Sequence, residues 1–600
     1  MESSSRDSDA RQPVHPAGAP HRLSLERAML VSAGVLLAAL AVGQFDIFGQ
    51  HYMARLLMQR EDTPVILAMA VLLILLAYLS PLGAAARAGR ALERSVAPAA
   101  CVMTVAAGLF VFFGTHLIAL DFAYSRDEAM AEFDAAIIAS GRLIAMVPPE
   151  WRPYVPALQP EFRLEVPGHV AWVSSYLPGN AAIRGVFGRA LGTAGTNAFL
   201  VVLSLAAVFG IARRLFPGRP DAWLIAVALM ATSSQVLFMG MTPYAMTAHL
   251  ALNLVWLWLF LRNDAPSHAC AVIVGFIATG LHQILFHPLF IAPFLLQLLL
   301  QRRLPLLAFY VVAYAAIGLF WIGYWQWLLA RSGVDAVAAG NAGLPFLVSR
   351  LVALLADFRL AGLETMNQNL LRFAAWQNPL LLVLGATGIG CAFSRSQLRA
   401  DAPMWPLAGG IVLTLAAMFV LLPYQGSGWG YRYIHGLIAS LALLSAFAWV
   451  RMTGDNGGRS DRSVAWSAFL GLTAFSVLVL APVHAVQVHE THAPYANAVA
   501  AMKRSKFDAI VVDTTSIFYG NDLVRNDPDL ADHPRVFDFG MLDAALIEKL
   551  CARSKVAVFS GADAARYGIV VTDPSDHPER ERLEAQWALM KRLSCSVPFE

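Results

Sequence analysis

The sequence predicts a mainly α-helical protein: a polytopic bundle of transmembrane helices that ends in a small α/β domain outside the membrane. Of its 600 residues, 58% are hydrophobic and only 14% are charged, whereas a soluble protein carries about 25% charged residues. Long apolar runs recur between residues 28 and 483, and all lysines of the chain follow residue 502. The formal net charge of +3 is too small to indicate a nucleic-acid partner.

The N-terminal segment, residues 1–27, is polar and contains several prolines and arginines. This composition predicts a disordered cytoplasmic tail. The apolar run that follows is long and has no A-x-A-like cleavage site, so it predicts a signal anchor and not a removable signal peptide.

Residues 28–483 hold enough apolar sequence for about 13 spans, since a helix needs about 20 apolar residues to cross the hydrocarbon core. Two runs, 222–261 and 265–301, are each long enough to cross twice, with turns expected at Thr242-Pro243 and His287-Pro288. The other runs are 29–45, 64–82, 95–120, 190–212, 304–330, 373–394, 402–422, 433–450 and 463–483.

Arginine placement orients the bundle, because cytoplasmic loops carry an excess of Lys and Arg. With the N-terminus in the cytoplasm, every alternate loop is rich in arginine, and the short outer loops keep only Arg55, Arg60 and Arg432. Longer outer loops are then expected at about 121–189 and 331–372, and the stretch from residue 484 also lies outside. The pattern predicts a bacterial inner-membrane protein with a periplasmic C-terminal domain.

The C-terminal segment, residues 484–600, predicts a small periplasmic α/β domain of docking or regulatory role. Short buried stretches indicate strands and amphipathic stretches indicate helices. The strands are expected at 509–512, 535–539 and 556–560, and the helices at 543–552 and 578–593. Whether the geometry allows Cys551 and Cys595 to form a disulfide is left open by the sequence.

The first outer loop begins with an acidic helix. Ser125 and Glu128 have the spacing of a capping box, and Gly141 lies where a helix C-terminal glycine is expected. Asp127 and Glu128 fall in the first turn, whereas Glu132 and Asp134 are expected on a solvated face. An apolar stripe predicts that this helix lies on the outer membrane surface. The stripe consists of Ala129, Met130, Phe133, Ala136 and Ile137.

Four motifs, in order along residues 120–440, carry a resemblance to a known family. They are Asp127-Glu128-Ala129 followed by Ala135 and Gly141-Arg142, the stretch 188–192 leading to 212–217, the turn 282–288, and the outer motif 428–436. This order resembles the GT-C class of polytopic glycosyltransferases, which includes protein O-mannosyltransferases and the aminoarabinose and lipopolysaccharide-sugar transferases. The chain departs from the family in having two spans, where one is usual, before the span that enters the acidic loop. Its C-terminal domain matches no family module.

The resemblance implies an inverting transfer from a polyprenyl-phosphate-linked sugar to an envelope glycan, lipid or protein on the periplasmic face. Asp127 is the candidate base that takes the proton of the acceptor hydroxyl. The alternative is an exposed acid that the helix dipole favours. Glu128 is equally an active-site partner or the capping-box glutamate.

The departing phosphate needs positive charge, and Arg432 is the candidate that supplies it. It is a lone arginine among aromatic residues, and its guanidinium pairs donors with phosphate oxygens in a way that a lysine cannot. Tyr431 and Tyr433 are grouped with it as candidate binding residues, although aromatic belts at membrane interfaces have the same composition.

His282 and His287, at a predicted outer turn, are candidates to hydrogen-bond the phosphate or the acceptor. A structural role as caps of short helices is the alternative. A divalent cation that bridges Asp127 and a phosphate is an open alternative, but no ligand cluster requires one. No other cofactor is expected.

Two other functions remain open from the sequence. A lipid-linked glycan transporter, flippase or polymerase is expected to carry ionisable residues inside its spans, whereas here the charged residues gather on the outer loops. A non-enzymatic envelope scaffold would act through its C-terminal domain. Deletion of that domain separates the cases, because a scaffold would lose its function and an enzyme would keep donor binding.

Overall fold

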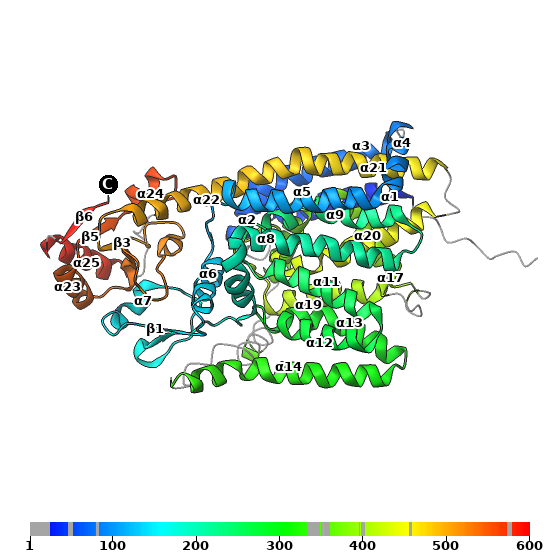
Figure 1. The fold of residues 1–600 in the computed structure, drawn as a ribbon. Helices are drawn as coiled ribbons and strands as arrows, with labels where there is room; N and C mark the ends of the chain where they lie inside the picture. Colours follow the sequence, from blue (N-terminus) through cyan, green and yellow to red (C-terminus); the bar gives the residue numbers. More distant parts are fainter. Residues whose placement is uncertain are drawn as a thin grey trace, which may run out of the picture.

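The structure is a computed structural model in which a helical bundle is followed, at one end, by a layer of loops and a small α/β domain (Figure 1). The described residues are 24–45, 52–79, 83–333, 348–349, 352, 361–394, 397, 403–454, 459–572, 579–593 and 595–599. Most of the predicted tail 1–27 and much of the predicted outer loop 331–372 lie outside the described residues.

Eight helices of the described part are long and apolar enough to cross a membrane, and five shorter apolar helices accompany them. The long ones are α1 (Leu25–Gln44), α2–η1–α3 (Tyr52–Leu57, Met58–Asp62, Thr63–Tyr78), α5 (Val96–Leu117), α8 (Gly179–Leu215), α14 (Leu304–Arg331), α19 (Met404–Leu421), η5–α20 (Arg432–Leu437, Ile438–Thr453) and α21–η6–α22 (Arg459–Phe475, Ser476–Leu480, Ala481–Arg504). The shorter ones are α9 (Pro220–Ala231), α11 (Met246–Arg262), α12 (Ala265–Thr279), α13 (Phe286–Leu300) and α17 (Pro379–Ala392). The chain is therefore a multi-pass membrane protein, while the number of crossings stays a prediction.

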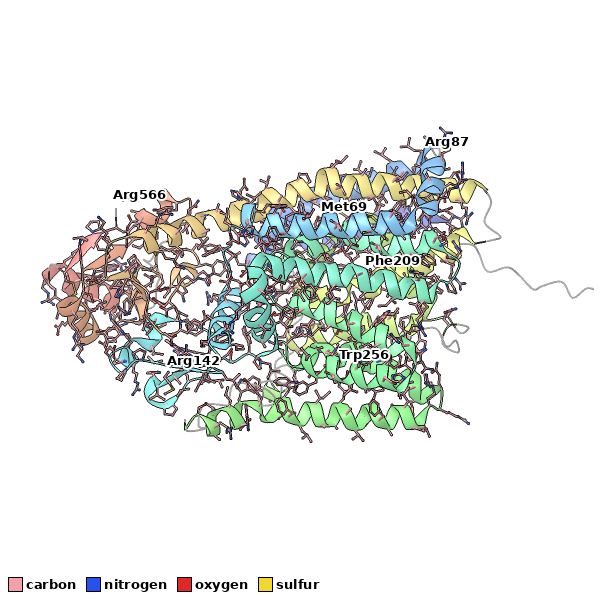
Figure 2. All side chains as sticks on the ribbon, viewed as in Figure 1. Met69, Arg87, Arg142, Phe209, Trp256 and Arg566 are labelled. Atoms are coloured by element: carbon pink, nitrogen blue, oxygen red, sulfur yellow. A yellow bond between two sulfur atoms is a disulfide. The ribbon has the colours of Figure 1, made fainter. Side chains whose placement is uncertain are left out.

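Three further helices complete the described part of the bundle. They are α4 (Gly83–Arg94), α10 (Ser234–Met239) and α16 (Ala361–Ala375). Met69, Phe209 and Trp256 lie within the bundle, whereas Arg87 of α4 lies at the end away from the C-terminal domain (Figure 2). The bundle thus has an apolar middle and charged ends, as the arginine pattern predicts for a membrane protein.

One of the two predicted mid-run turns is confirmed and the other is wrong. Thr242-Pro243 lies in the break between α10 and α11. In the second run the break covers residues 280–285, and His287-Pro288 lies in the first turn of α13. A proline is tolerated there because the first N–H groups of a helix have no intrahelical partner.

The outer layer begins with α6 (Arg126–Ala139), which lies across the end of the bundle between it and the C-terminal domain (Figure 1). The predicted end of this helix is confirmed, since Gly141 follows it with a φ of +81°. The layer continues with β1 (Ala145–Met146), η2 (Arg152–Tyr154), α7 (Val155–Leu158), η3 (Pro167–His169) and β2 (Ala171–Trp172). The strands β1 and β2 pair antiparallel.

The C-terminal domain is a four-stranded parallel sheet in the order β4-β3-β5-β6, flanked by helices. All three predicted strands and both predicted helices are confirmed. The strands are β3 (Ala509–Val512), β4 (Arg535–Asp538), β5 (Val556–Phe559) and β6 (Ser596–Pro598), and the helices are η7 (Gly520–Leu523), η8 (Phe539–Met541), α23 (Ala544–Arg553), α24 (Gly561–Arg566) and α25 (Arg580–Leu593). A disulfide between Cys551 and Cys595 links the end of α23 to the start of β6.

The apolar stripe of α6 does not face a membrane surface, and that expectation is wrong. Met130, Phe133 and Ile137 are buried in one hydrophobic cluster with Val511 of β3 and Phe537 of β4. The helix is amphipathic because this face is buried in a core that the outer layer and the C-terminal domain share, and Phe133 meets Trp172 of β2 edge-on at 5.8 Å. The sequence pattern alone cannot distinguish an apolar face that packs on lipid from one that packs on a domain distant in sequence.

Candidate active site

The first turn of α6 carries the two carboxyl groups that the sequence singles out. The Ser125 side chain caps the helix by accepting from the Glu128 N–H at 3.3 Å, which satisfies one of the free amides of the first turn. This cap fixes where α6 begins and therefore which way Asp127 points.

Asp127 is bound by side chains from two distant parts of the chain. Arg432 Nη1 donates to Asp127 Oδ2 at 2.8 Å, and the Tyr176 hydroxyl donates to Oδ1 at 2.5 Å. Burial opposes ionisation, but Arg432 and then His282 and Tyr176 outweigh it and hold the pKa of the carboxyl below its ordinary value. Asp127 is therefore a carboxylate at neutral pH.

Arg432 is the first residue of η5 and is almost fully buried. Its guanidinium lies over the ring of Tyr244 at 5.0 Å and that of Tyr433 at 5.2 Å, close enough for cation–π attraction. Its Nε has no hydrogen-bond partner among the described residues. The arginine thus keeps a free donor beside the one that binds Asp127.

The loop before Arg432 needs its glycines. Gly428 and Gly430 have φ of +149° and +70°, where a side chain is strained. A Cβ at Gly430 would lie 2.3 Å from Gln235 Oε1. The Gln425 side chain then accepts from the Arg432 N–H at 2.8 Å, so the loop returns to the bundle with Arg432 facing α6.

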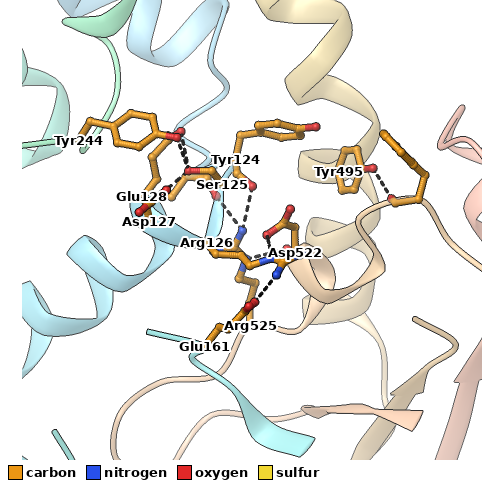
Figure 3. Close-up of polar contacts among 12 residues, drawn as sticks. Tyr124, Ser125, Arg126, Asp127, Glu128, Glu161, Tyr244, Tyr495, Asp522 and Arg525 are labelled. Atoms are coloured by element: carbon orange, nitrogen blue, oxygen red, sulfur yellow. Dashed lines mark hydrogen bonds and ion pairs between the residues drawn. The ribbon is translucent and has the colours of Figure 1, made fainter. Parts of the chain in front are cut away.

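Glu128, next to Asp127, has the opposite protonation state. It is 2% exposed, its Oε1 accepts from Ser125 Oγ at 3.2 Å, and its Oε2 has no hydrogen-bond partner among the described residues. Burial raises its pKa to about 8. Ser125 Oγ also lies 2.6 Å from the Tyr244 hydroxyl, which joins the cap to the aromatic rings around Arg432 (Figure 3).

A cavity of about 20 Å³ lies beside Asp127 and is lined also by Asp134, Tyr176, Tyr244 and His282. The expectation that Asp134 lies on a solvated face is wrong. Asp134 is partly buried, and burial raises its pKa to about 7. Positions i and i+7 share a helix face, so the spacing of Asp127 and Asp134 was a sequence signal for this pairing.

The predicted binding residues divide into two groups. His282 joins the site, since its ring stacks on that of Tyr176 with centroids 4.2 Å apart, and burial lowers its pKa to about 4. His287 does not join it, because its ring nitrogens lie 2.8 Å from Asn253 Oδ1 and 2.8 Å from the Tyr314 hydroxyl.

The two flanking tyrosines also differ. Tyr433 stacks on Arg432, whereas Tyr431 is completely buried against Tyr433. Neither ring occupies the exposed position of an aromatic belt. Tyr176 and Tyr244 are the aromatic residues of the site that sequence reasoning missed, since each lies in an irregular segment with no motif around it.

A larger cavity, of about 560 Å³, lies on the opposite face of α6, toward the C-terminal domain. It is lined by charged side chains that include Arg126, Glu132, Asp522 and Arg525, and Asp127 is not among its lining residues. Glu132 is exposed in this cavity, as predicted for a solvated residue.

Two buried arginines support the loops that carry the aromatic residues. Arg184 of α8 donates to the carbonyl oxygens of Thr242 and Tyr244 at 3.1 and 3.4 Å. Arg372 of α16 donates to the Gly428 carbonyl at 3.3 Å. These contacts fix Tyr244 and the segment before Arg432 relative to the bundle.

The described residues do not form a metal site. No group of three or more His, Cys, Asp or Glu side chains within the described part is arranged to hold a metal ion. Both oxygens of Asp127 are already engaged by Arg432 and Tyr176.

Fold and site together define a multi-pass membrane protein with a buried Asp–Arg pair at one end of its bundle. No protein-family profile matches the chain, and no curated protein matches it.

The structure is similar to solved GT-C glycosyltransferases at low sequence identity. One is ArnT from Cupriavidus metallidurans in the apo state, with 13% identity, 76% of this chain and 91% of that chain covered, and a TM-score of 0.44. The same protein bound to undecaprenyl phosphate has 13% sequence identity to this chain. The match covers 72% of this chain and 85% of that chain, with a TM-score of 0.37. The archaeal oligosaccharyltransferase AglB from Archaeoglobus fulgidus, in complex with an inhibitory peptide and a dolichol-phosphate, has 15% sequence identity to this chain. The match covers 68% of this chain and 58% of that chain, with a TM-score of 0.38. The chain therefore spans less than two thirds of that oligosaccharyltransferase.

Proposed function

We propose that this chain is a membrane glycosyltransferase that moves a sugar from a polyprenyl-phosphate donor to an acceptor hydroxyl on the periplasmic face. The observation that carries the proposal is the buried pair of Asp127 and Arg432 at the end of the bundle. The pair combines a carboxylate able to accept a proton with a guanidinium able to hold a phosphate.

The donor phosphate has a direct competitor in this arrangement. In the structure Arg432 is bound by Asp127, and its Nε is free of partners among the described residues. A phosphate that binds Arg432 draws the guanidinium away from the carboxylate, which raises the proton affinity of Asp127 when the donor arrives. The base then strengthens only when a donor is present.

The transfer step follows from these two groups. The acceptor oxygen attacks the anomeric carbon while Asp127 takes the hydroxyl proton. The bond between that carbon and the phosphate oxygen breaks, and its electron pair leaves with the phosphate, whose charge Arg432 stabilises. Attack opposite to the leaving group inverts the anomeric centre.

An apolar groove lined in part by residues that closely follow Arg432 in sequence supports a lipid donor. A cavity of about 180 Å³ is lined almost entirely by apolar side chains of α16, α17, α19 and α20, together with Ile434 and Leu437 of η5. Ile434 lies two residues after Arg432. A prenyl chain in this groove would bring its phosphate to the start of η5, and apolar burial would hold it there.

The test uses the full chain in lipid nanodiscs. With a polyprenyl-phosphate sugar and an envelope extract as acceptor source, Asp127→Asn should lower the release of polyprenyl phosphate by at least about 100-fold, the usual contribution of a general base. A wild-type rate in this variant would overturn the assignment. A flippase would instead return the sugar still attached to its lipid.

Binding of undecaprenyl phosphate alone provides a second measurement. Asp127→Asn should bind it more tightly than the wild type, because Arg432 loses its internal partner, and Arg432→Gln should bind it more weakly. Arg60→Gln, which removes an exposed arginine, is the matched control and should bind like the wild type. Equal affinity in all variants would contradict the role of Arg432.

A further inference from the structure

The C-terminal domain contacts both ends of α6 through one short segment. Residues 522–529, here called the clamp segment, run from the last two residues of η7 toward β4. Its side chains contact the entrance of α6, the residue after its C-terminal glycine, and two points of the outer layer. Each contact joins parts of the chain that are several hundred residues apart.

At the entrance of α6, the contact is made by Arg525. Its Nη2 donates to the carbonyl oxygens of Ala123 and Tyr124 at 2.8 and 3.2 Å, and its guanidinium lies over the Phe122 ring at 5.2 Å. These residues directly precede Ser125, the cap of α6. Asp522 lies 3.7 Å from Arg126, the first residue of the helix (Figure 3).

At the far end of α6, the contact is an ion pair with two hydrogen bonds. Arg142 Nη1 and Nη2 donate to the two carboxylate oxygens of Asp529 at 2.8 and 2.7 Å. The clamp segment binds the outer layer through two neutral hydrogen bonds. Trp172 Nε1 donates to the Pro528 carbonyl at 3.0 Å, and Asn526 Nδ2 donates to the Leu158 carbonyl at 2.8 Å.

The clamp segment is itself held by the domain. Within the segment, Arg525 Nε donates to the Asp522 carbonyl at 2.7 Å. Asn526 makes a reciprocal pair with Val536 of β4, accepting from its N–H and donating to its carbonyl at 2.8 Å each. The segment therefore transmits the position of the sheet to α6, whose apolar stripe already shares a core with that sheet.

We infer that the C-terminal domain is a positioning element of the active site, and that Arg525 is the residue through which it sets the direction of Asp127. The inference rests on the proposed function for its catalytic consequence. Arg525 touches no reacting atom; it orders the two carbonyl groups before Ser125. A shift of about 1 Å at a reacting group can cost about 100-fold in rate, so the loss of this contact should lower turnover.

The test compares Arg525→Gln, Arg525→Lys and Arg566→Gln in the full chain. Arg566 is the matched control because it belongs to the same domain and its side chain is 63% exposed. Arg525→Gln should lower kcat for transfer by about 10 to 100-fold and leave the donor KM near its wild-type value, since donor binding depends on Arg432. Arg525→Lys, which keeps a charged donor, should recover part of the rate, and Arg566→Gln should behave as the wild type.

Amide hydrogen exchange gives a readout that does not require activity. In Arg525→Gln the amides of α6 should exchange faster, while those of β3 keep their protection. If β3 also loses protection, Arg142→Gln replaces Arg525→Gln as the milder variant. It removes an exposed ion pair with Asp529 and a hydrogen bond to Ser140, and faster exchange should then appear at the C-terminal end of α6.

The outcomes separate the two proposals. If the wild type shows no transfer, the proposed function fails, and exchange alone decides: faster exchange in α6 supports the clamp, and unchanged exchange overturns it. If the wild type shows transfer, the inference is overturned when Arg525→Gln and Arg566→Gln have the same kcat and the same exchange in α6.

Discussion

Asp127 and Glu128 are neighbours in sequence, but Asp127 is ionised and Glu128 is protonated at neutral pH. Asp127 finds Arg432 and Tyr176 within hydrogen-bond distance, so its pKa falls below the ordinary value in spite of burial. Glu128 is buried, with the Ser125 hydroxyl as the side-chain partner of its carboxyl group among the described residues, and burial raises its pKa to about 8. Environment, and not residue type, assigns the charge to Asp127 and the proton to Glu128.

The buried proton of Glu128 predicts a pH dependence of stability. The folded chain keeps this proton up to about pH 8, whereas the unfolded chain releases it near the ordinary value of 4.5. Stability should therefore fall as pH rises between these values. Glu128→Gln, which cannot ionise, should flatten this part of the curve. Thermal unfolding in detergent from pH 5 to pH 8.5 measures it.

Two further variants sharpen that measurement. Glu150→Gln replaces an exposed glutamate and should keep the wild-type slope. Asp134, whose pKa burial raises to about 7, contributes a slope of the same sign, so the double change with Asp134→Asn should flatten the curve further. A wild-type slope in Glu128→Gln would show that Glu128 is ionised in the folded chain.

At the scale of elements, the segment η1 places two acids inside the bundle. Arg372 Nη1 of α16 donates to Asp62 Oδ1 at 3.2 Å and to Glu61 Oε2 at 3.1 Å. The same guanidinium binds the Gly428 carbonyl, in the loop that leads to Arg432. A buried ion cluster thus connects the N-terminal hairpin to the active-site loop.

Removal of Arg372 should destabilise this connection. Arg372→Ala leaves Asp62, 1% exposed, without its counter-ion, and a buried charge without a partner costs about 3 kcal/mol or more. Arg372→Met combined with Asp62→Leu should recover most of the loss, since apolar residues can replace a buried ion pair. Denaturation in detergent measures both. Equal stability of the single variant and the wild type would contradict the ion cluster.

The sequence predicts elements well where local pattern determines them. Residues 509–512 form β3 with the predicted bounds, because a short apolar run between polar segments suits a buried strand. The face of α6 could not be assigned in the same way. Its apolar stripe packs in a core shared by the outer layer and the C-terminal domain, and periodicity shows that a face is buried without showing what covers it.

The same limit applies to the site. Asp127 and Arg432 were singled out separately, by motif and by charge, and the structure joins them across 305 positions. Tyr176 and Tyr244 have no motif of their own, so only the fold reveals their contacts. His287 was expected at an outer turn because a His-Pro pair resembles one, whereas it lies in the first turn of α13, where a proline satisfies the same pattern.

At the scale of the whole molecule, the bundle and the C-terminal domain are one interlocked structure around α6. The helix is held by the bundle through Arg432 and Tyr244, and by the domain through the clamp segment and the shared core. By the inference above, the domain helps to orient Asp127, while the docking or regulatory role that the sequence predicts stays a prediction.

The helix α21–η6–α22 enters this domain without a break, as one continuous ribbon from the bundle to the sheet (Figure 1). The number of residues in this helix sets the angle at which the C-terminal domain faces the bundle. One alanine inserted after Glu490 would turn everything beyond it by about 100° and advance it by about 1.5 Å, and the clamp segment would face away from α6. Transfer should be lost in that variant, whereas one alanine inserted after Gly568, in an exposed turn, should be tolerated. Exposed loops should therefore accept insertions, whereas the length of this helix is constrained because it sets the direction in which the C-terminal domain faces.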